Sequence, residues 1–354
     1  MRMLIVSSKQ DLQSETGCEQ EIARAVRQYI AEHKDIATKF IYYDIPSKYS
    51  PKRVQKNARS IRDFISKIEE KWGTIDFLLL LGGDRIVPFF RLENPCDDGD
   101  MKVLSDNPYA SRDEDFLIPE RACARIPDNK DAGFIIAQLK KKHKVYRRSF
   151  GISTKTWKEA SKAVYRFVGN TRSLKTSPPV EHTEFKKSWL RNKDYLYFNL
   201  HGAKESEYWY GQDGNQYPRA LGPDAVDRAA GFVAAECCYG AYIVRKSDQT
   251  ALALKFLAEK DIQGFSGSTT IAYGPVKPPS GEADLLTRYL FQYLKQGLTT
   301  GESFRNAKQD FARKMLRQQG FLDEDDQKTL LQFVLYGDPT VKFTAGSKKM
   351  RMSA

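Results

Sequence analysis

Short apolar runs alternate with amphipathic stretches in the first part of the chain. Runs rich in β-formers at 3–8, 39–45 and 77–81 predict three buried strands. Apolar residues recur at helical spacing over 19–33 and over a second stretch that opens with Pro51 near its first turn. This β-α-β-α-β order predicts a parallel sheet with helices on its faces.

The same alternation continues through the second part of the chain. Further strands are predicted at 122–126, 195–200, 232–235 and 264–268, and further helices at 131–148, 157–168, 220–229, 248–258, 281–295, 301–317 and 326–334. We therefore predict an α/β fold with a mostly parallel central sheet flanked by helices, in two halves. The halves are predicted as residues 1–150 and 151–345, followed by a basic tail at 346–354.

Two of the predicted strands end in residues that carry chemistry. The strand at 195–200 stops at His201-Gly202, and the apolar run at 232–235 is followed by Glu236, Cys237 and Cys238. The separation of 37 residues between His201 and Cys238 leaves room for a crossover helix between two parallel strands. Because ligands and catalytic groups collect at the carboxyl ends of such strands, an imidazole and a thiol are expected side by side.

A thiol beside an imidazole is the arrangement that cysteine nucleophiles need, since the thiolate attacks and the base raises its population. The alternative is a buried structural cysteine, the usual state of a free thiol. Neighbouring strand residues point to opposite sides, so only one of Cys237 and Cys238 can face His201.

An ordered set of stretches along the chain resembles the gingipain-type family of caspase-like cysteine peptidases. They are His201-Gly202 with the later Glu236-Cys237-Cys238, Ser105-Asp-Asn-Pro-Tyr109, Ala124-Arg-Ile-Pro-Asp128, Phe265-Ser-Gly-Ser-Thr-Thr-Ile-Ala-Tyr-Gly274 and Leu335-Tyr-Gly-Asp-Pro-Thr340. The resemblance covers about Leu79 to Phe343 and implies a caspase-like fold and endopeptidase activity without a cofactor.

The resemblance also implies roles for particular residues. His201 would be the general base and then the general acid, the thiol would form a thioester with the substrate, and backbone N–H groups near Gly202 would bind the oxyanion. Family members place an acid two residues before the nucleophile, which makes Cys238 the nucleophile after Glu236. A Cys-x-x-Gly spacing, also found in relatives, would select Cys237 instead.

Candidate substrate-binding residues lie in three places. Relatives that cleave after Arg or Lys use an acidic residue to pair with that side chain, and Asp113 and Asp115 fall near its position. They belong to an acidic stretch, 97–115, that would equally suit a solvated loop or a calcium site. Trp209, shortly after His201, is expected to line a substrate groove or to pack in the core, and Glu236 is assigned to substrate binding as well.

Composition and charge leave other functions open. The net charge is +12, and the run Lys140-Lys-Lys-His-Lys144 is either a solvated helix face or a patch for nucleic acid or an acidic partner. The alternatives to a peptidase are a catalytically silent binding module of the same fold and a basic nucleotide- or nucleic-acid-binding protein. Nucleic acid is disfavoured because no reading motif accompanies the charge, and Gly82-Gly83 lacks the lysine of a P-loop.

Location and regulation are predicted from what the chain lacks. No Cys/His set has zinc-ligand spacing, no run reaches a membrane span of about 18 apolar residues, and the first residues do not form a signal peptide. Five cysteines without framework spacing favour a reduced, cytoplasmic location. A cytoplasmic peptidase needs restraint, so we expect an activating or inhibitory protein partner, or internal cleavage.

Overall fold

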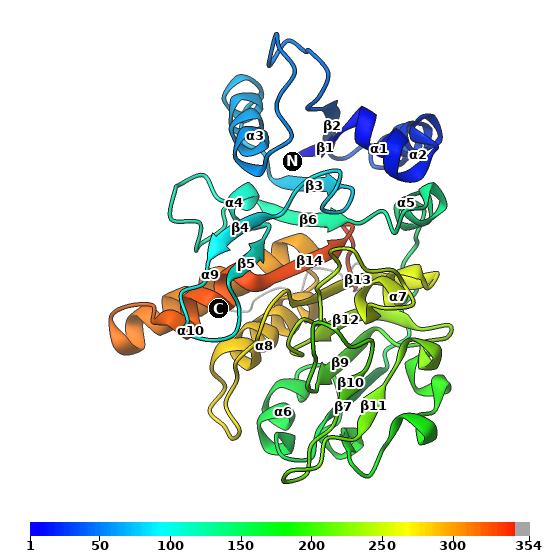
Figure 1. Ribbon diagram of the computed structural model, residues 1–354, viewed down its shortest axis with the longest axis vertical. Coiled ribbons are helices and arrows are strands. Elements are labelled where there is room, and N and C mark those ends of the chain that lie inside the picture. Colours follow the sequence, from blue (N-terminus) through cyan, green and yellow to red (C-terminus); the bar gives the residue numbers. More distant parts are fainter. Residues whose placement is uncertain (344–354) are drawn as a thin grey trace, which may run out of the picture.

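The computed structural model describes residues 1–343, and ten strands in this range form one central sheet (Figure 1). The order across the sheet is β2-β1-β3-β6-β14-β13-β12-β9-β7-β8. These strands are β1 Arg2–Ser7, β2 Ala37–Tyr42, β3 Phe77–Leu81, β6 Ala122–Ile126, β7 Ser149–Thr154, β8 Lys175–Ser177, β9 Tyr195–Asn199, β12 Ala230–Ala235, β13 Asp261–Ser268 and β14 Phe333–Gly337. Two small hairpins lie outside the sheet: β4 Phe90–Glu93 with β5 Lys102–Ser105, and β10 Trp209–Tyr210 with β11 Arg219–Leu221.

The sheet consists of two parallel sets that run in opposite directions. Every neighbouring pair is parallel except β13 and β14, which meet in the middle and are antiparallel. The chain passes from the first set to the second between β6 and β7, and β14 returns to the first set. The predicted α/β fold with a mostly parallel sheet is therefore confirmed.

Helices cover both faces of the sheet, as the sequence predicted. In Figure 1, α2, α5 and α7 lie on one side and α3, α6, α8 and α9 on the other. The helices are α1 Lys9–Thr16, α2 Glu19–Glu32, α3 Ala58–Trp72, α4 Asn107–Ala110, α5 Ala132–Leu139, α6 Lys158–Tyr165, α7 Leu252–Ala258, α8 Glu282–Lys295, α9 Thr300–Gln319 and α10 Glu324–Gln332. Odd-numbered residues of β12 pack on the α7 side and even-numbered ones on the α8 side.

The structure corrects two predicted helices: one is absent, and the other is shorter than predicted. The predicted crossover helix 220–229 is absent: β11 and a short 3-10 turn, Pro223–Ala225, occupy it, because Gly222 and Pro223 interrupt the pattern. The predicted helix 131–148 ends at Leu139, where the apolar stripe stops and the lysine run begins.

Two predicted boundaries are also corrected. α3 begins at Ala58 rather than near Pro51, because the Asn57 side chain caps it by accepting a hydrogen bond from Ser60 N. The last predicted helix, 326–334, stops at Gln332, and Phe333–Gly337 forms β14. β14 was missed because its apolar residues continue the helical stripe of α10.

The basic tail predicted at 346–354 lies outside the described residues, 1–343. Within that range, no helix has both the length and the apolarity that crossing a membrane requires.

Candidate active site

His201 and Cys238 follow two neighbouring parallel strands. β9 and β12 pair in a register that joins Phe198 to Ala235, and His201 and Cys238 each follow three residues after this pair. The approach is close: a Cβ added to Gly202 would lie 2.0 Å from the carbonyl oxygen of Cys238. Only glycine at 202 permits this contact between the two strand ends.

The two adjacent thiols have different surroundings. Cys237 is fully buried in the core on the α7 side, where its thiol lies 3.9 Å from the Phe198 carbonyl oxygen. Cys238 is partly exposed and lines two hollows, and its Sγ accepts a hydrogen bond from Ala272 N at 3.3 Å. Of the pair, Cys238 is the thiol that a substrate can reach.

The imidazole of His201 is held by neighbours that the sequence did not identify. Its Nε2 lies 2.9 Å from Oε1 of Gln212, and its ring lies 4.3 Å from the ring of Trp157 and 5.2 Å from that of Tyr217. Because Oε1 accepts, this contact places the proton on Nε2 and leaves Nδ1 as the base. Trp157 follows β7, the strand next to β9, so the strand-end rule would have found it, whereas nothing in the sequence points to Gln212.

The surroundings of both groups favour their neutral forms. Burial raises the pKa of the Cys238 thiol. Burial lowers the pKa of His201, and the hydrogen bond to Gln212 opposes this only in part. A thiol and a neutral imidazole are therefore the resting forms, and a thiolate requires transfer of the proton to the ring.

A cavity of about 280 Å³ opens beside Cys238 on the α8 side, and we call it the thiol cavity. Its lining is formed by Trp157, Asn199, Leu200, Glu236, Cys238, Ala272, Tyr273, Gly274, Pro275, Val276, Ala283 and Asp284. Glu236 and Asp284 contribute two carboxyl groups that are almost fully buried, with 6% and 1% of their surface exposed. The sequence assigned Glu236 to substrate binding but did not single out Asp284, which resembles an ordinary acid in the first turn of α8.

These two carboxyl groups lack a cationic partner among the described residues. Within residues 1–343, no cation pairs with Oε1 of Glu236 or Oδ2 of Asp284, which are both buried, and the two carboxyl groups share a hydrogen bond with each other. The other oxygen of Glu236 accepts from Tyr197 Oη at 2.8 Å, and that of Asp284 accepts from Asn199 Nδ2 at 3.3 Å. Burial raises the pKa of Glu236 well above its usual range, as does the charge of Asp284, and burial raises the pKa of Asp284 to about 6.

A smaller hollow, of about 20 Å³, lies against Cys238 on its other side, and we call it the Lys246 hollow. Its lining includes Trp209, Tyr242, Lys246 and Leu252 as well as Cys238. Trp209 was expected either to line a substrate groove or to pack in the core. In the structure it lines this hollow and also packs against Phe198 in the core.

Asp113 and Asp115 lie apart from these hollows. Both are exposed on the loop after α4, where the Asp113 carbonyl accepts from Arg62 of α3 and the Asp115 carboxylate accepts from Leu117 N at 3.0 Å. Neither residue lines the thiol cavity or the Lys246 hollow. The structure therefore does not bring these two acids to the cysteine.

Other acids of the same stretch do reach the site, through the loop that joins β4 to β5. Asp100 accepts hydrogen bonds from Tyr239 Oη at 2.7 Å and from Ile271 N at 2.8 Å. Asp98 and Asp100 both pair with the fully buried ammonium of Lys328, so these two carboxylates already have a cation. Asp100 thus holds the two segments on either side of the thiol, since Tyr239 follows Cys238 and Ile271 precedes Ala272.

The sequence profile of Peptidase family C25 matches residues 1–164 and 192–344. The chain belongs to this family. It is a cysteine peptidase of the gingipain type, as the sequence motifs predicted.

Solved structures agree with this C25 assignment at the level of the fold. The Arg-specific cysteine proteinase gingipain R shares 13% identity at a TM-score of 0.65, with 96% of this chain and 77% of that chain covered. A complex of the pro- and mature domains of RgpB from Porphyromonas gingivalis also has 13% identity and a TM-score of 0.65, covering 96% and 79%. A further protease structure has 14% identity and a TM-score of 0.62, covering 97% and 78%. Among curated proteins, none matches this chain in sequence.

Replacing Asp100 with asparagine is expected to lower kcat of the C25 peptidase by about 10- to 100-fold, because small displacements near reacting atoms have effects of this size. Asparagine has one acceptor oxygen where Asp100 uses two, so it loses an acceptor for either Tyr239 Oη or Ile271 N, and it loses the charge that pairs with Lys328. The segments beside the thiol are then held less firmly. Steady-state kinetics with a short peptide and the rate of Cys238 alkylation would measure this. Asp97→Asn, an exposed neighbour, is the matched control. A normal kcat in Asp100→Asn would show that this carboxylate does not position the thiol.

Replacing Gly202 with alanine is expected to lower kcat/KM of the C25 peptidase by at least about 100-fold. The new Cβ cannot stay 2.0 Å from the Cys238 carbonyl oxygen, so the two strand ends must separate. Gly133→Ala in α5, where a Cβ meets only the side chain of Asp131, serves as control for a generic loss of glycine. Circular dichroism would establish that both variants fold, and unchanged kinetics in folded Gly202→Ala would contradict the expected contact.

Proposed function

We propose that the protein is an endopeptidase that cleaves after Arg or Lys, with Cys238 as nucleophile and His201 as general base. The Cys238 thiol gives its proton to His201 Nδ1, and the sulfur attacks the scissile carbonyl carbon. The C–N bond then breaks, the amine takes the proton from His201, and a thioester remains. Water, deprotonated by His201, hydrolyses the thioester and releases the acid product and the thiol.

The observation that carries the proposed specificity is the pair of buried carboxyl groups in the thiol cavity that has no cationic partner among the described residues. Buried carboxyl groups with raised pKa values lack a counter-charge, and a guanidinium or ammonium group entering the cavity would supply one. Trp157 and Tyr273 line the same cavity, where aromatic rings suit the methylene stem and the cation of such a side chain. Glu236 and Asp284, rather than Asp113 and Asp115, would recognise the basic residue.

Stabilisation of the oxyanion is proposed to come from backbone N–H groups where the strands of His201 and Cys238 end. The close packing of Gly202 on the Cys238 backbone favours this, because donors there need no side chain and are held by two strands. No metal or cofactor is needed for these steps. In residues 1–343, no group of three or more His, Cys, Asp or Glu side chains is arranged to hold a metal ion.

Regulation by a protein partner or by internal cleavage is a further part of the proposal. The complex of the pro- and mature domains of RgpB supports it, because in that neighbour a further protein domain is bound to the mature peptidase. Intact mass measurement of the purified chain alongside its specific activity would test this. Full activity of an uncut chain without a partner would overturn it.

A reducing, cytoplasmic location is proposed from the cysteines. All five are unpaired in the structure. Disulfides are the norm in small proteins of oxidising compartments, so five free thiols favour a reduced setting. Fractionation of cells of the source organism with an antibody would test the location, and recovery of the protein outside the cell would contradict it.

A fluorogenic peptide library that varies only the residue before the scissile bond would test the proposed function. We expect cleavage after Arg and Lys, and none after Asp, Glu or apolar residues. Cleavage led by an acidic or apolar residue would contradict recognition by Glu236 and Asp284.

A further inference from the structure

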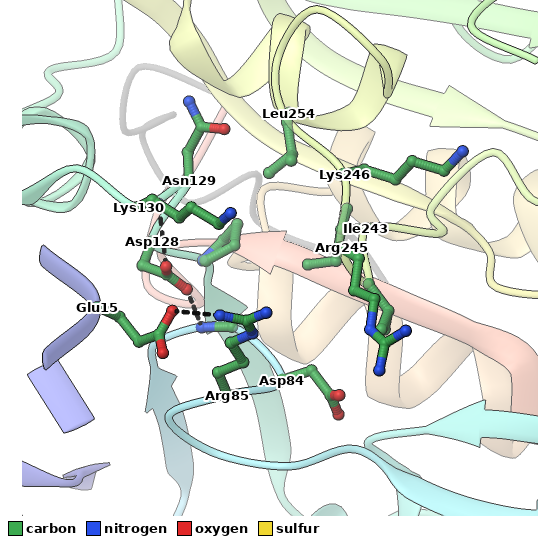
Figure 2. Close-up of a pocket in the computed structure, with 13 residues that line it drawn as sticks. Glu15, Asp84, Arg85, Asp128, Asn129, Lys130, Ile243, Arg245, Lys246 and Leu254 are labelled. Atoms are coloured by element: carbon green, nitrogen blue, oxygen red, sulfur yellow. Dashed lines mark hydrogen bonds and ion pairs between the residues drawn. The ribbon is translucent and has the colours of Figure 1, made fainter.

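A third hollow, of about 180 Å³, lies where loops from both sets of strands meet (Figure 2). One side comes from the loops after β3 and β6, at the carboxyl ends of two parallel strands, where α/β proteins commonly bind ligands. The other side comes from the segment Ile243–Lys246, which follows the cysteine. We call it the basic hollow after its side chains Arg85, Lys130, Arg245 and Lys246.

The basic hollow is fixed by hydrogen bonds between its loops. Gly83 N donates to the Asp128 carboxylate at 2.8 Å, and Asp248 N donates to the Asn129 side chain at 3.2 Å. Of the nine non-glycine residues in 1–343 with positive φ, three line this hollow: Asn129, Lys130 and Arg245. Such conformations cost free energy and collect at functional sites, so the shape of the hollow is preformed.

The charges of the hollow leave two cations over. Each of its carboxylates is already committed: Glu15 to Arg85 at 3.4 Å, Asp84 to Arg91 at 2.7 Å, and Asp128 to backbone N–H groups. Lys246 pairs with Glu205, outside the hollow, at 3.6 Å. The side chains of Lys130 and Arg245 are exposed and have no hydrogen-bond or ion-pair partner within residues 1–343. In Figure 2 the ammonium of Lys130 points into the hollow that the labelled residues surround.

The basic hollow lies next to the hollow beside Cys238. Lys246 lines both the basic hollow and the Lys246 hollow, and Cys238 lines the latter. Cys238 therefore has the thiol cavity on one side, and the Lys246 hollow and then the basic hollow on the other. A peptide that places its basic residue in the thiol cavity would extend past Cys238 toward the basic hollow.

We propose that the basic hollow is a substrate subsite that takes an acidic side chain of the peptide, on the far side of the scissile bond from the basic residue. The proposal rests on the proposed function, because it uses the same direction of peptide binding. Lys130 and Arg245 would pair with the carboxylate, and Arg85 would add to the positive field. The protein thus selects peptides in which a basic residue is followed, some positions later, by an acidic one.

Binding to the inactive Cys238→Ala chain tests this subsite without depending on catalysis. The probes are fluorescent peptides with one Arg and an Asp-Glu pair moved one position at a time along an otherwise Ala/Ser/Gly sequence. We expect one placement to bind about five- to tenfold tighter than the neutral peptide, as partly exposed ion pairs allow. Adding Lys130→Ala and Arg245→Ala should remove this gain, while Lys52→Ala with Lys142→Ala, two exposed lysines elsewhere, should keep it. No gain at any placement, or a gain that survives in the first double variant, would overturn the subsite.

Two further measurements distinguish a subsite for a peptide carboxylate from a site for a free anion. In the active chain, Lys130→Glu should replace the preference for an acidic extension by a preference for a Lys-Lys extension. This preference is measured as kcat/KM for each extended peptide relative to that for the short Arg peptide. Inorganic phosphate should compete only with the acidic extension. Equal effects of phosphate on short and extended peptides would mean a site for a free anion and would overturn the proposal. If the neutral Arg peptide is neither bound nor cleaved, the proposed specificity for Arg and Lys fails. The comparison of peptides with and without the Asp-Glu pair still tests whether the basic hollow binds an acidic side chain.

Discussion

Replacing Cys238 with alanine should reduce kcat/KM by at least about a thousandfold, since losing a nucleophile leaves only binding and electrostatic effects. His201→Ala should have a loss of similar size, and the double variant should be no worse than the worse single one, because the two groups act as a unit. Kinetics with an Arg peptide, and thermal unfolding to establish the fold, would measure this.

Cys237→Ala is the matched control for this prediction. Its thiol lies in the core on the α7 side, so the variant should unfold at a slightly lower temperature but keep most of its kcat. Loss of activity in folded Cys237→Ala with activity retained in Cys238→Ala would reverse the assignment of the nucleophile.

Replacing Asp284 with asparagine should reduce the preference for Arg over an uncharged isostere such as citrulline by about 100- to 10,000-fold, the range seen when a buried polar partner is lost. Asparagine has nearly the same shape, so the cavity itself should persist. The effect should fall on kcat/KM for Arg and Lys peptides and spare the rate of thiol alkylation by iodoacetamide. Glu282→Gln, an acid in the same helix turn that does not line the thiol cavity, is the control.

This prediction has a pH dependence whose sign follows from the raised pKa values. A cation pairs with the ionised carboxylate, and burial raises the pKa of Asp284 to about 6. Affinity for a basic side chain should therefore be present above that value and decline as pH falls below it. KM for an Arg peptide should rise on acidification in the native chain, and this rise should be absent in Asp284→Asn. A KM that is flat between about pH 5 and 7, bracketing that pKa, would contradict pairing with Asp284.

The pairing of the two strands that precede His201 and Cys238 could be predicted because strand direction and strand ends are encoded locally. Apolar runs at 195–200 and 232–235 fix two buried strands, and their parallel pairing follows from the α/β pattern. Gly202, after the first strand, then packs against the backbone of Cys238, after the second. This holds although the connection between the strands is a hairpin and a 3-10 turn instead of the predicted helix.

Other features depend on contacts that sequence patterns do not contain. β14 continues the apolar stripe of α10, so its change to a strand is decided by pairing with β13 and β6. Asp284 reads as a favourable acid at a helix start, and only the packing of α8 on β12 reveals that it is buried beside Glu236. Asp113 and Asp115 had the expected residue type, but the loop that carries them folds onto α3.

Covalent labelling tests the central claim most directly. The purified chain would be treated with a peptidyl acyloxymethyl ketone that carries Arg, digested, and mapped by mass spectrometry. We predict a label on Cys238 that is absent in His201→Ala and weak when Arg is replaced by citrulline. A label on Cys237, or a label on Cys238 that persists at full rate in His201→Ala, would contradict the account.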